Sequence, residues 1–207
     1  ILPFALALTI LFTCQVHAQT YTLGTGTSSN SGTSYPAPYG NYWWGAKNQF
    51  IYYASELTAA GATAGPIGQI GFNITAINSG APATTLSGFS MRIKNSSTSN
   101  LSTWETGLTT VLNPTSYTPV LGWNMHSLNT PFVWDGTSNI IVETCFNNGA
   151  PYTNNESTEW TINFPDTVSL TYRADISTVC PSTNISFYST SRPNIRMGNP
   201  LTNDLGV

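Results

Sequence analysis

The chain has 207 residues and a formal net charge of −3, and only 7% of its residues are charged. Its six Lys and Arg residues are scattered along the chain and form no basic patch, which argues against nucleic acid as a partner. Most polar positions are held by Ser, Thr, Asn, Gly and Tyr. This composition is typical of an exported protein built from β-strands.

Residues 1–18 are predicted to be an N-terminally truncated signal peptide. Residues 1–12 are apolar except for Pro3 and Thr9, and Val16 and Ala18 supply the small side chains that precede a cleavage site. A dozen apolar residues are too few to cross a membrane, which needs about 20. We therefore expect a secreted or cell-surface protein whose mature chain has no membrane span.

The remaining residues are expected to form one domain over residues 19–198, followed by a linker at 199–207 that leads toward further domains. About 190 residues suit a single large β domain with a sizeable core. An extended strand is expected around residues 21–23, followed by a loop rich in Gly, Ser, Thr and Pro up to Gly40.

From residue 49 onward, apolar and polar residues alternate with a period of two, which indicates β-strands with one buried face. In 168–173, this pattern places Val168, Leu170 and Tyr172 on the core side. Residues 139–146 are apolar on both sides at first, which predicts a central strand. The alternating segments are 69–76, 89–94, 159–164 and 168–173.

Helix signals are confined to two short segments. Residues 55–60 read as a helical turn with Ser55 as N-cap and Gly61 as its end, and Ser102 with Glu105 fits a capping box. The chain is therefore predicted to be all-β, an antiparallel two-sheet β-sandwich with one or two short helical turns. A jelly roll fits the longer connections better than an immunoglobulin-like sandwich, although both remain open.

Cleavage after residue 18 would remove Cys14 and leave Cys145 and Cys180. Two cysteines in an exported chain most often pair, so a disulfide is expected between them. The alternative is two buried free thiols in separate strands.

Several segments resemble a known family of β-sandwich modules, which lie near the N-termini of large bacterial secreted proteins that end in a type IX secretion sorting domain. The resemblance spans most of residues 20–198 and implies export to the cell surface or medium. It brings no active-site motif. The segments that carry it are residues 35–40, 49–57, 65–67, 122–124, 131–139 and 192–195.

Catalytic residue types are scarce. His126 is the one histidine after the leader, no G-x-S-x-G motif accompanies it, and a surface or edge-strand position is expected for it. One His and two distant Cys also match no zinc-site spacing. We therefore predict that the protein is not an enzyme.

Paired carboxylates are the alternative route to catalysis, as in a carbohydrate-active hydrolase or its ancillary domain. Glu143 is the leading candidate because it sits in the most apolar strand. Its structural alternative, which we favour, is pairing with Arg92, Arg173 or a backbone donor. The candidate second carboxylates are Asp175, Glu156 and Glu159.

No cofactor is expected, apart from a weak calcium hypothesis. Asp135 and Asn139 provide oxygen ligands around a tight turn, and loops of sandwich modules often hold such an ion. An Asp-Gly turn at Asp135 and Gly136 explains the same residues without a metal.

Aromatic residues before the first long strand give the strongest indication of a binding site. Tyr39, Tyr42, Trp43 and Trp44 crowd a Gly-rich loop, where exposed rings can stack on sugars or anchor an interface. The alternative is that both Trp side chains close the end of the sandwich. A surface rich in hydroxyls and amides would hydrogen-bond to neutral glycans. The four remaining tryptophans, Trp104, Trp123, Trp134 and Trp160, are expected in the core.

The sequence thus predicts a secreted, non-catalytic structural or adhesive module that binds a polysaccharide or another surface component. A hydrolase and a purely architectural spacer are the alternatives.

Overall fold

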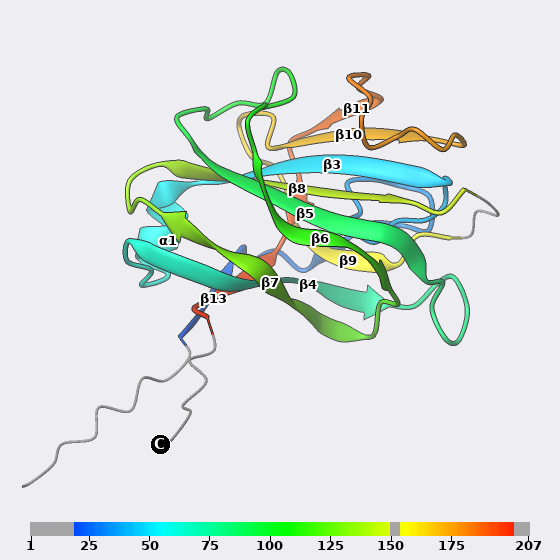
Figure 1. Cartoon of the computed structure of the whole chain (residues 1–207), viewed down its shortest axis with the longest axis horizontal. Helices are drawn as coiled ribbons and strands as arrows, with labels where there is room; N and C mark the ends of the chain where they lie inside the picture. Colours follow the sequence, from blue (N-terminus) through cyan, green and yellow to red (C-terminus); the bar gives the residue numbers. More distant parts are fainter. Residues whose placement is uncertain (1–18, 150–153, 201–207) are drawn as a thin grey trace, which may run out of the picture.

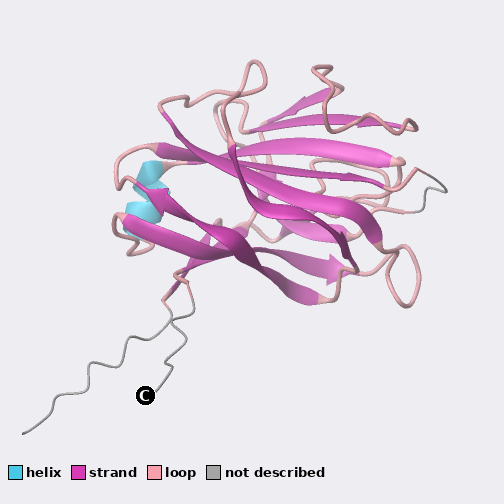
Figure 2. Ribbon diagram, viewed as in Figure 1, coloured by secondary structure: helices cyan, strands magenta, loops and turns pink. Residues whose placement is uncertain are grey.

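The computed structural model describes residues 19–149 and 154–200, in which two antiparallel β-sheets pack face to face (Figures 1 and 2). The predicted two-sheet β-sandwich is therefore confirmed, whereas the jelly-roll connectivity stays a prediction. The expected signal peptide at 1–18 and residues 201–207 of the expected linker lie outside the described residues. Within the described part, no helix is long and apolar enough to cross a membrane.

The six-stranded sheet forms the upper layer in Figure 1. β8 lies near its middle, paired with β3 on one side and with β5 on the other. In order across the sheet, the strands are β11 (Phe187–Ser189), β10 (Ser169–Ala174), β3 (Gly45–Tyr52), β8 (Asn139–Asn147), β5 (Leu86–Ser96) and β6 (Thr109–Tyr117).

The seven-stranded sheet forms the lower layer. Its path runs through β1 (Thr20–Leu23), β13 (Ile195–Gly198), β4 (Gly65–Ala76), β9 (Ser157–Thr161) and β12 (Arg192–Pro193). Two strands lie off this path: β2 (Ser28–Ser29) pairs with β9, and β7 (Gly122–Trp134) pairs with β4.

The main core lies between the sheets and is built from the alternating apolar residues of both. Ile70, Phe72 and Ile74 of β4 are buried, as the sequence predicted, and Phe50 packs its ring against Phe72 with a centroid separation of 5.9 Å. In β5, Phe89, Met91 and Ile93 are buried while Arg92 and Lys94 point away from the core. β8 is buried along its interior on both faces, which confirms the predicted central strand.

The outer face of the six-stranded sheet carries a second, smaller apolar cluster. Ile51 of β3 is the cross-strand partner of Ile141 of β8, and Leu170 of β10 packs in the same cluster. Leu101 and Leu108 cover them from the β5–β6 connection. This cluster explains why β8 is buried on both faces.

The expected facing of β10 is wrong. Leu170 packs in the outer cluster, whereas Thr171 turns inward and donates a hydrogen bond of 2.7 Å to Asn48 Oδ1. Asn48 in turn lies 3.4 Å from Thr144 Oγ1 across the sheet. In β10, the side that faces the main core is therefore polar, and the apolar side faces the outer cluster. This is the opposite of what the alternation predicts.

The one helix of the described residues is α1 (Ala54–Ala59), which follows β3. Its N-cap is Tyr53 and not Ser55, because the Glu56 carboxylate accepts the Tyr53 backbone N–H at 2.9 Å. Gly61 follows its end with φ +85°, as expected for a helix stop. The second expected turn, at Ser102–Glu105, is not a helix; Glu105 instead binds Thr98 and Lys94.

Of the four tryptophans expected in the core, only Trp134 is buried there. Trp104, Trp123 and Trp160 are half-buried. Lys47 lies over the Trp104 ring at 4.2 Å and Arg196 over the Trp123 ring at 4.1 Å, so these two rings serve as platforms for cations on the outer faces of the two sheets.

The two ends of the described chain lie side by side (Figure 1). β1 pairs with β13, and Asn199 N–H donates to the Gln19 carbonyl at 3.0 Å. α1 contacts β1, so the chain ends share the end of the sandwich at which β3 finishes. β3 begins at the other end of the sandwich, and its eight extended residues span about 26 Å.

Candidate functional site

The aromatic loop (Tyr42, Trp43 and Trp44) immediately precedes β3, at the end of the sandwich opposite the chain ends. All three side chains are half-buried and so reach the surface. Tyr39, the fourth residue expected there, is completely buried in the main core. The sequence prediction is therefore wrong for Tyr39, because its ring turns inward to pack against Phe89 and Tyr117.

Backbone hydrogen bonds hold the aromatic loop in place. Tyr42 N–H donates to Asn155 Oδ1 at 2.8 Å, and Trp44 N–H donates to Asp175 Oδ1 at 3.1 Å. The Trp44 carbonyl accepts the N–H of Asn148 at 2.6 Å. These partners come from three separate segments, so the loop is fixed before any ligand arrives. Fixing a loop in advance lowers the entropic cost of binding.

The side chains of the aromatic loop make ordered contacts. Trp43 packs against the main core and meets the Tyr42 ring edge-on, at 5.8 Å and 80°. The Arg173 guanidinium lies over the Trp43 ring at 5.6 Å and over the buried Tyr35 ring at 4.9 Å. Arg173, considered above as a possible partner of Glu143, lies instead at the aromatic loop, while Arg92 pairs with Glu143. The position of Arg173 at the end of an alternating strand gave no signal of this contact.

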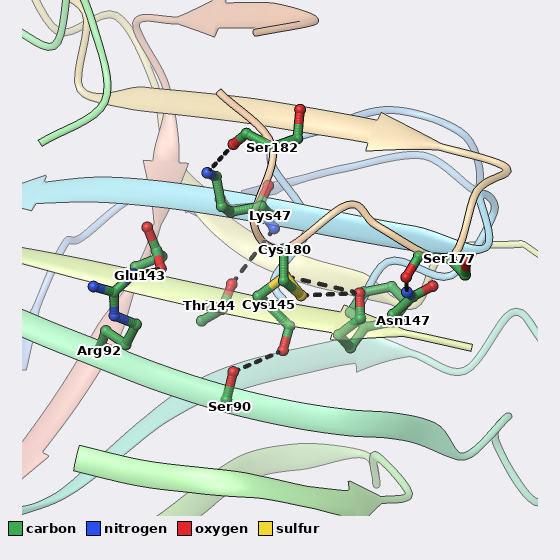
Figure 3. Close-up of a disulfide and its surroundings, with 12 residues drawn as sticks. Lys47, Ser90, Arg92, Glu143, Thr144, Cys145, Asn147, Ser177, Cys180 and Ser182 are labelled. Atoms are coloured by element: carbon green, nitrogen blue, oxygen red, sulfur yellow. Dashed lines mark hydrogen bonds and ion pairs between the residues drawn. A yellow bond between two sulfur atoms is a disulfide. The ribbon is translucent and has the colours of Figure 1, made fainter. Parts of the chain in front are cut away.

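The Cys145–Cys180 disulfide, which confirms the predicted pairing, fastens a neighbouring segment (Figure 3). This disulfide loop, residues 175–186, also contains Asp175, the acceptor for Trp44. Lys47 Nζ donates to the Ser182 carbonyl at 2.5 Å, and Asn147 donates to the Ser177 carbonyl. The disulfide loop thus supports the aromatic loop from one side.

Glu143, the candidate catalytic carboxylate, lies on the outer face of β8 and is 5% exposed. Its Oε1 is 3.1 Å from Arg92 Nη1, and its Oε2 accepts a hydrogen bond of 2.8 Å from Gln49 Nε2 (Figure 3 draws Arg92 and Glu143). Gln49 also binds the backbone of Glu105 in both directions, at 2.9 Å each. Both oxygens of Glu143 are therefore engaged in cross-strand contacts that join the β5–β6 connection to the sheet.

The expected second carboxylates do not gather around Glu143. Glu159 lies on β9 of the other sheet, where it accepts a hydrogen bond from Asn73 at 3.1 Å. Glu156, just before β9, is buried and accepts the Asn78 N–H at 2.7 Å. Asp175 binds the aromatic loop as described above.

His126 is buried, so the expected surface position is wrong. Its ring lies among the rings of Tyr39, Phe89 and Tyr117, with centroid separations of 5.9, 5.1 and 4.3 Å. Burial lowers the pKa of His126 from 6.5 to about 4. The Nε2 atom of the neutral ring is hydrogen-bonded to the Tyr39 hydroxyl at 2.8 Å, and the same hydroxyl donates to the Asn124 carbonyl at 3.3 Å. His126 therefore supports the core and does not line a surface site.

Acid is expected to destabilise the fold through His126. Because the folded-state pKa lies below the unfolded value, the unfolded chain binds more protons, and stability falls as the pH drops from about 6.5 toward 4. The loss amounts to about 3 kcal/mol. Urea unfolding of wild type and of His126→Gln at pH 7 and pH 4 measures it. The variant should lose less stability than wild type between the two pH values, and equal losses would contradict this assignment.

In the Asp135–Asn139 turn, the site of the calcium hypothesis, one Asp135 carboxylate oxygen and the Asn139 side-chain oxygen already accept hydrogen bonds from the protein. Asp135 Oδ1 accepts the N–H groups of Thr137 and Ser138 at 2.8 and 2.7 Å, and the hydrogen bond from the Ser138 side chain together with these two bonds lowers the pKa of Asp135 to about 2. Asn139 Oδ1 accepts the Ala54 N–H at 2.9 Å. Gly136 has φ +85°, as an Asp-Gly turn requires. Among the described residues, no group of three or more His, Cys, Asp or Glu is placed to hold a metal ion.

Comparison with protein-family models, with curated proteins and with solved structures gives no match. The aromatic loop with its supports is the surface feature on which the functional interpretation depends.

Proposed function

We propose that the protein is a secreted, non-catalytic recognition module of a bacterial cell-surface or extracellular protein, and that it binds polysaccharide through the aromatic loop. One observation carries this proposal: the half-buried rings of Trp43 and Trp44 sit on a loop whose backbone is hydrogen-bonded to three other segments. Aromatic faces stack on the apolar faces of sugar rings, and a fixed loop presents them without a cost of ordering.

The position of the aromatic loop supports recognition over a purely architectural spacer. An in-line spacer has its two ends at opposite poles, so that the chain runs through its long dimension. Here Gln19 and Asn199 are hydrogen-bonded neighbours, and the aromatic loop lies at the far end of β3 from them. A module whose two chain ends lie together is attached to the rest of the protein at that end only. The aromatic loop, at the opposite end, then stays accessible to a ligand.

The disulfide fits an extracellular role, because disulfides persist in oxidising compartments. The outer-face carboxylate Glu143 has its oxygens bound by Arg92 and Gln49, so it does not favour the hydrolase alternative. Recognition is therefore the better account of the exposed features.

A glycan-array experiment tests the proposal. Wild type should bind at least one polysaccharide, and Trp43→Ala combined with Trp44→Ala should weaken that binding about 30-fold, as expected for loss of anchoring aromatic residues. Trp44→Ala alone serves as a milder variant, because Trp43 also packs against the core. Trp123→Ala is the matched control, since Trp123 is also half-buried but lies on the other sheet. Absence of binding by wild type, or equal loss in the control, would contradict the proposal.

A further inference from the structure

Arg173 differs from the other five cationic residues of the chain in its hydrogen bonding. Each of the other five donates from its charged group to an acceptor elsewhere in the protein. The Arg173 guanidinium donates to none of the residues that the structure describes, and no salt bridge joins it to a described carboxylate. The five are Lys47, Arg92, Lys94, Arg192 and Arg196.

Two aromatic rings hold this guanidinium instead. Tyr35 is buried, and its hydroxyl donates to the Gly40 carbonyl at 3.2 Å, so its ring forms a fixed wall. The guanidinium carbon lies 4.9 Å from the centre of this ring and 5.6 Å from that of Trp43. Cation–π contact uses the flat face of the guanidinium and leaves its N–H edge available. Arg173 is thus oriented while its donors remain unused by the described protein.

Arg173 belongs to the same surface as the aromatic loop. It lies at the end of β10, opposite Ala46 at the start of β3, and it is half-buried. Asp175, two residues further on, fixes the backbone of Trp44. One surface therefore presents two partly exposed indole rings beside one planar cation.

We propose that Arg173 binds the carboxylate of an acidic sugar, so that the ligand is a uronate-containing polysaccharide whose sugar rings contact Trp43 and Trp44. This inference rests on the proposed function and narrows it from glycans in general. The two parallel N–H groups of a guanidinium match the two oxygens of a carboxylate, a geometry that an ammonium group lacks. A net charge of −3 and the nearby Asp175 carboxylate oppose non-specific binding of polyanions, so recognition depends on this local pairing.

Calorimetric titration with matched ligands tests the inference. Polygalacturonate, alginate and a glucuronate polymer are each compared with the methyl-esterified form of the same polymer, which keeps the rings and removes the charge. Wild type should bind at least one of the acidic forms about 10- to 100-fold more tightly than its ester, the range expected when a charged hydrogen-bonded pair is lost.

Arg173→Lys keeps the charge but removes the planar pair of donors, so its affinity for the acidic polymer should fall by a similar factor, and by more than its affinity for the ester. Arg196→Lys is the matched control, because Arg196 also stacks on a tryptophan but lies on the other sheet. Thermal unfolding of both variants checks that they fold. The ester comparison needs no variant.

Three results would overturn the inference. If wild type binds acidic and esterified polymers equally, and the tryptophan variants still weaken that binding, the recognition proposal stands and the carboxylate assignment fails. If wild type prefers a sulfated polysaccharide or poly-glutamate, the ligand class is wrong. If no polysaccharide binds, both proposals fail together.

Discussion

Replacement of Cys145 and Cys180 by Ala is expected to lower the free energy of unfolding by about 4 kcal/mol. The disulfide closes a segment of 35 residues, and in the chain-entropy model a closure of that length restricts the unfolded chain by about this amount. Urea unfolding at neutral pH gives the value directly.

The same substitution is also expected to weaken ligand binding. The disulfide loop positions Asp175, whose carboxylate holds the Trp44 N–H, so loss of its anchor releases one support of the aromatic loop. Wild type treated with a dithiol reductant should match the double variant in both stability and binding, which controls for effects of the Ala side chains. Unchanged stability in the double variant would show that the hydrogen bonds of Lys47 and Asn147 suffice to hold the loop.

Arg192→Ala is expected to destabilise the fold by about 3–5 kcal/mol, because it breaks an ion pair whose guanidinium is buried and removes a large side chain from a packed site. Arg192 is completely buried at the start of β12. Its two terminal nitrogens donate to the Ile51 carbonyl and to the Glu56 carboxylate, and its guanidinium stacks 4.4 Å from the centre of the Phe164 ring. The substitution leaves the Ile51 carbonyl and the carboxylate without this donor and opens a cavity.

Arg196→Ala provides the comparison for Arg192. Arg196 is partly exposed, stacks on Trp123 and donates one hydrogen bond to Thr22. Its loss should cost less than about 1 kcal/mol, as for surface cation–π contacts. Similar losses for the two variants, measured by urea unfolding under identical conditions, would contradict the structural role assigned to Arg192.

Alternation along the sequence predicted the strands well where one face meets the main core. β4 and β5 follow the period-two pattern with the expected residues buried. β10 shows the limit of this reasoning: its alternation is regular, but the side that faces the main core is polar. The second apolar cluster against which Leu170 packs comes from the β5–β6 connection, about which the local pattern carries no information.

The candidate site could be predicted only in part. Trp43 and Trp44 were identified from their crowding before a strand, and both reach the surface. Tyr39 lies a few residues away in the same loop and yet is buried. Its hydroxyl is hydrogen-bonded to His126, which lies on a strand 87 positions further along the chain. Arg173 and Asp175 reach the loop from the end of β10, and no local signal connects residues so far apart.

The most direct test of polysaccharide recognition by the aromatic loop is a nuclear magnetic resonance titration of the isotope-labelled protein with an oligosaccharide identified by the array. The six tryptophan indole N–H signals report on six places in the fold. Binding at the aromatic loop should shift the signals of Trp43 and Trp44 most, together with the backbone signal of Arg173. Shifts concentrated at Trp123 or Trp104, or no shifts at saturating ligand, would contradict it.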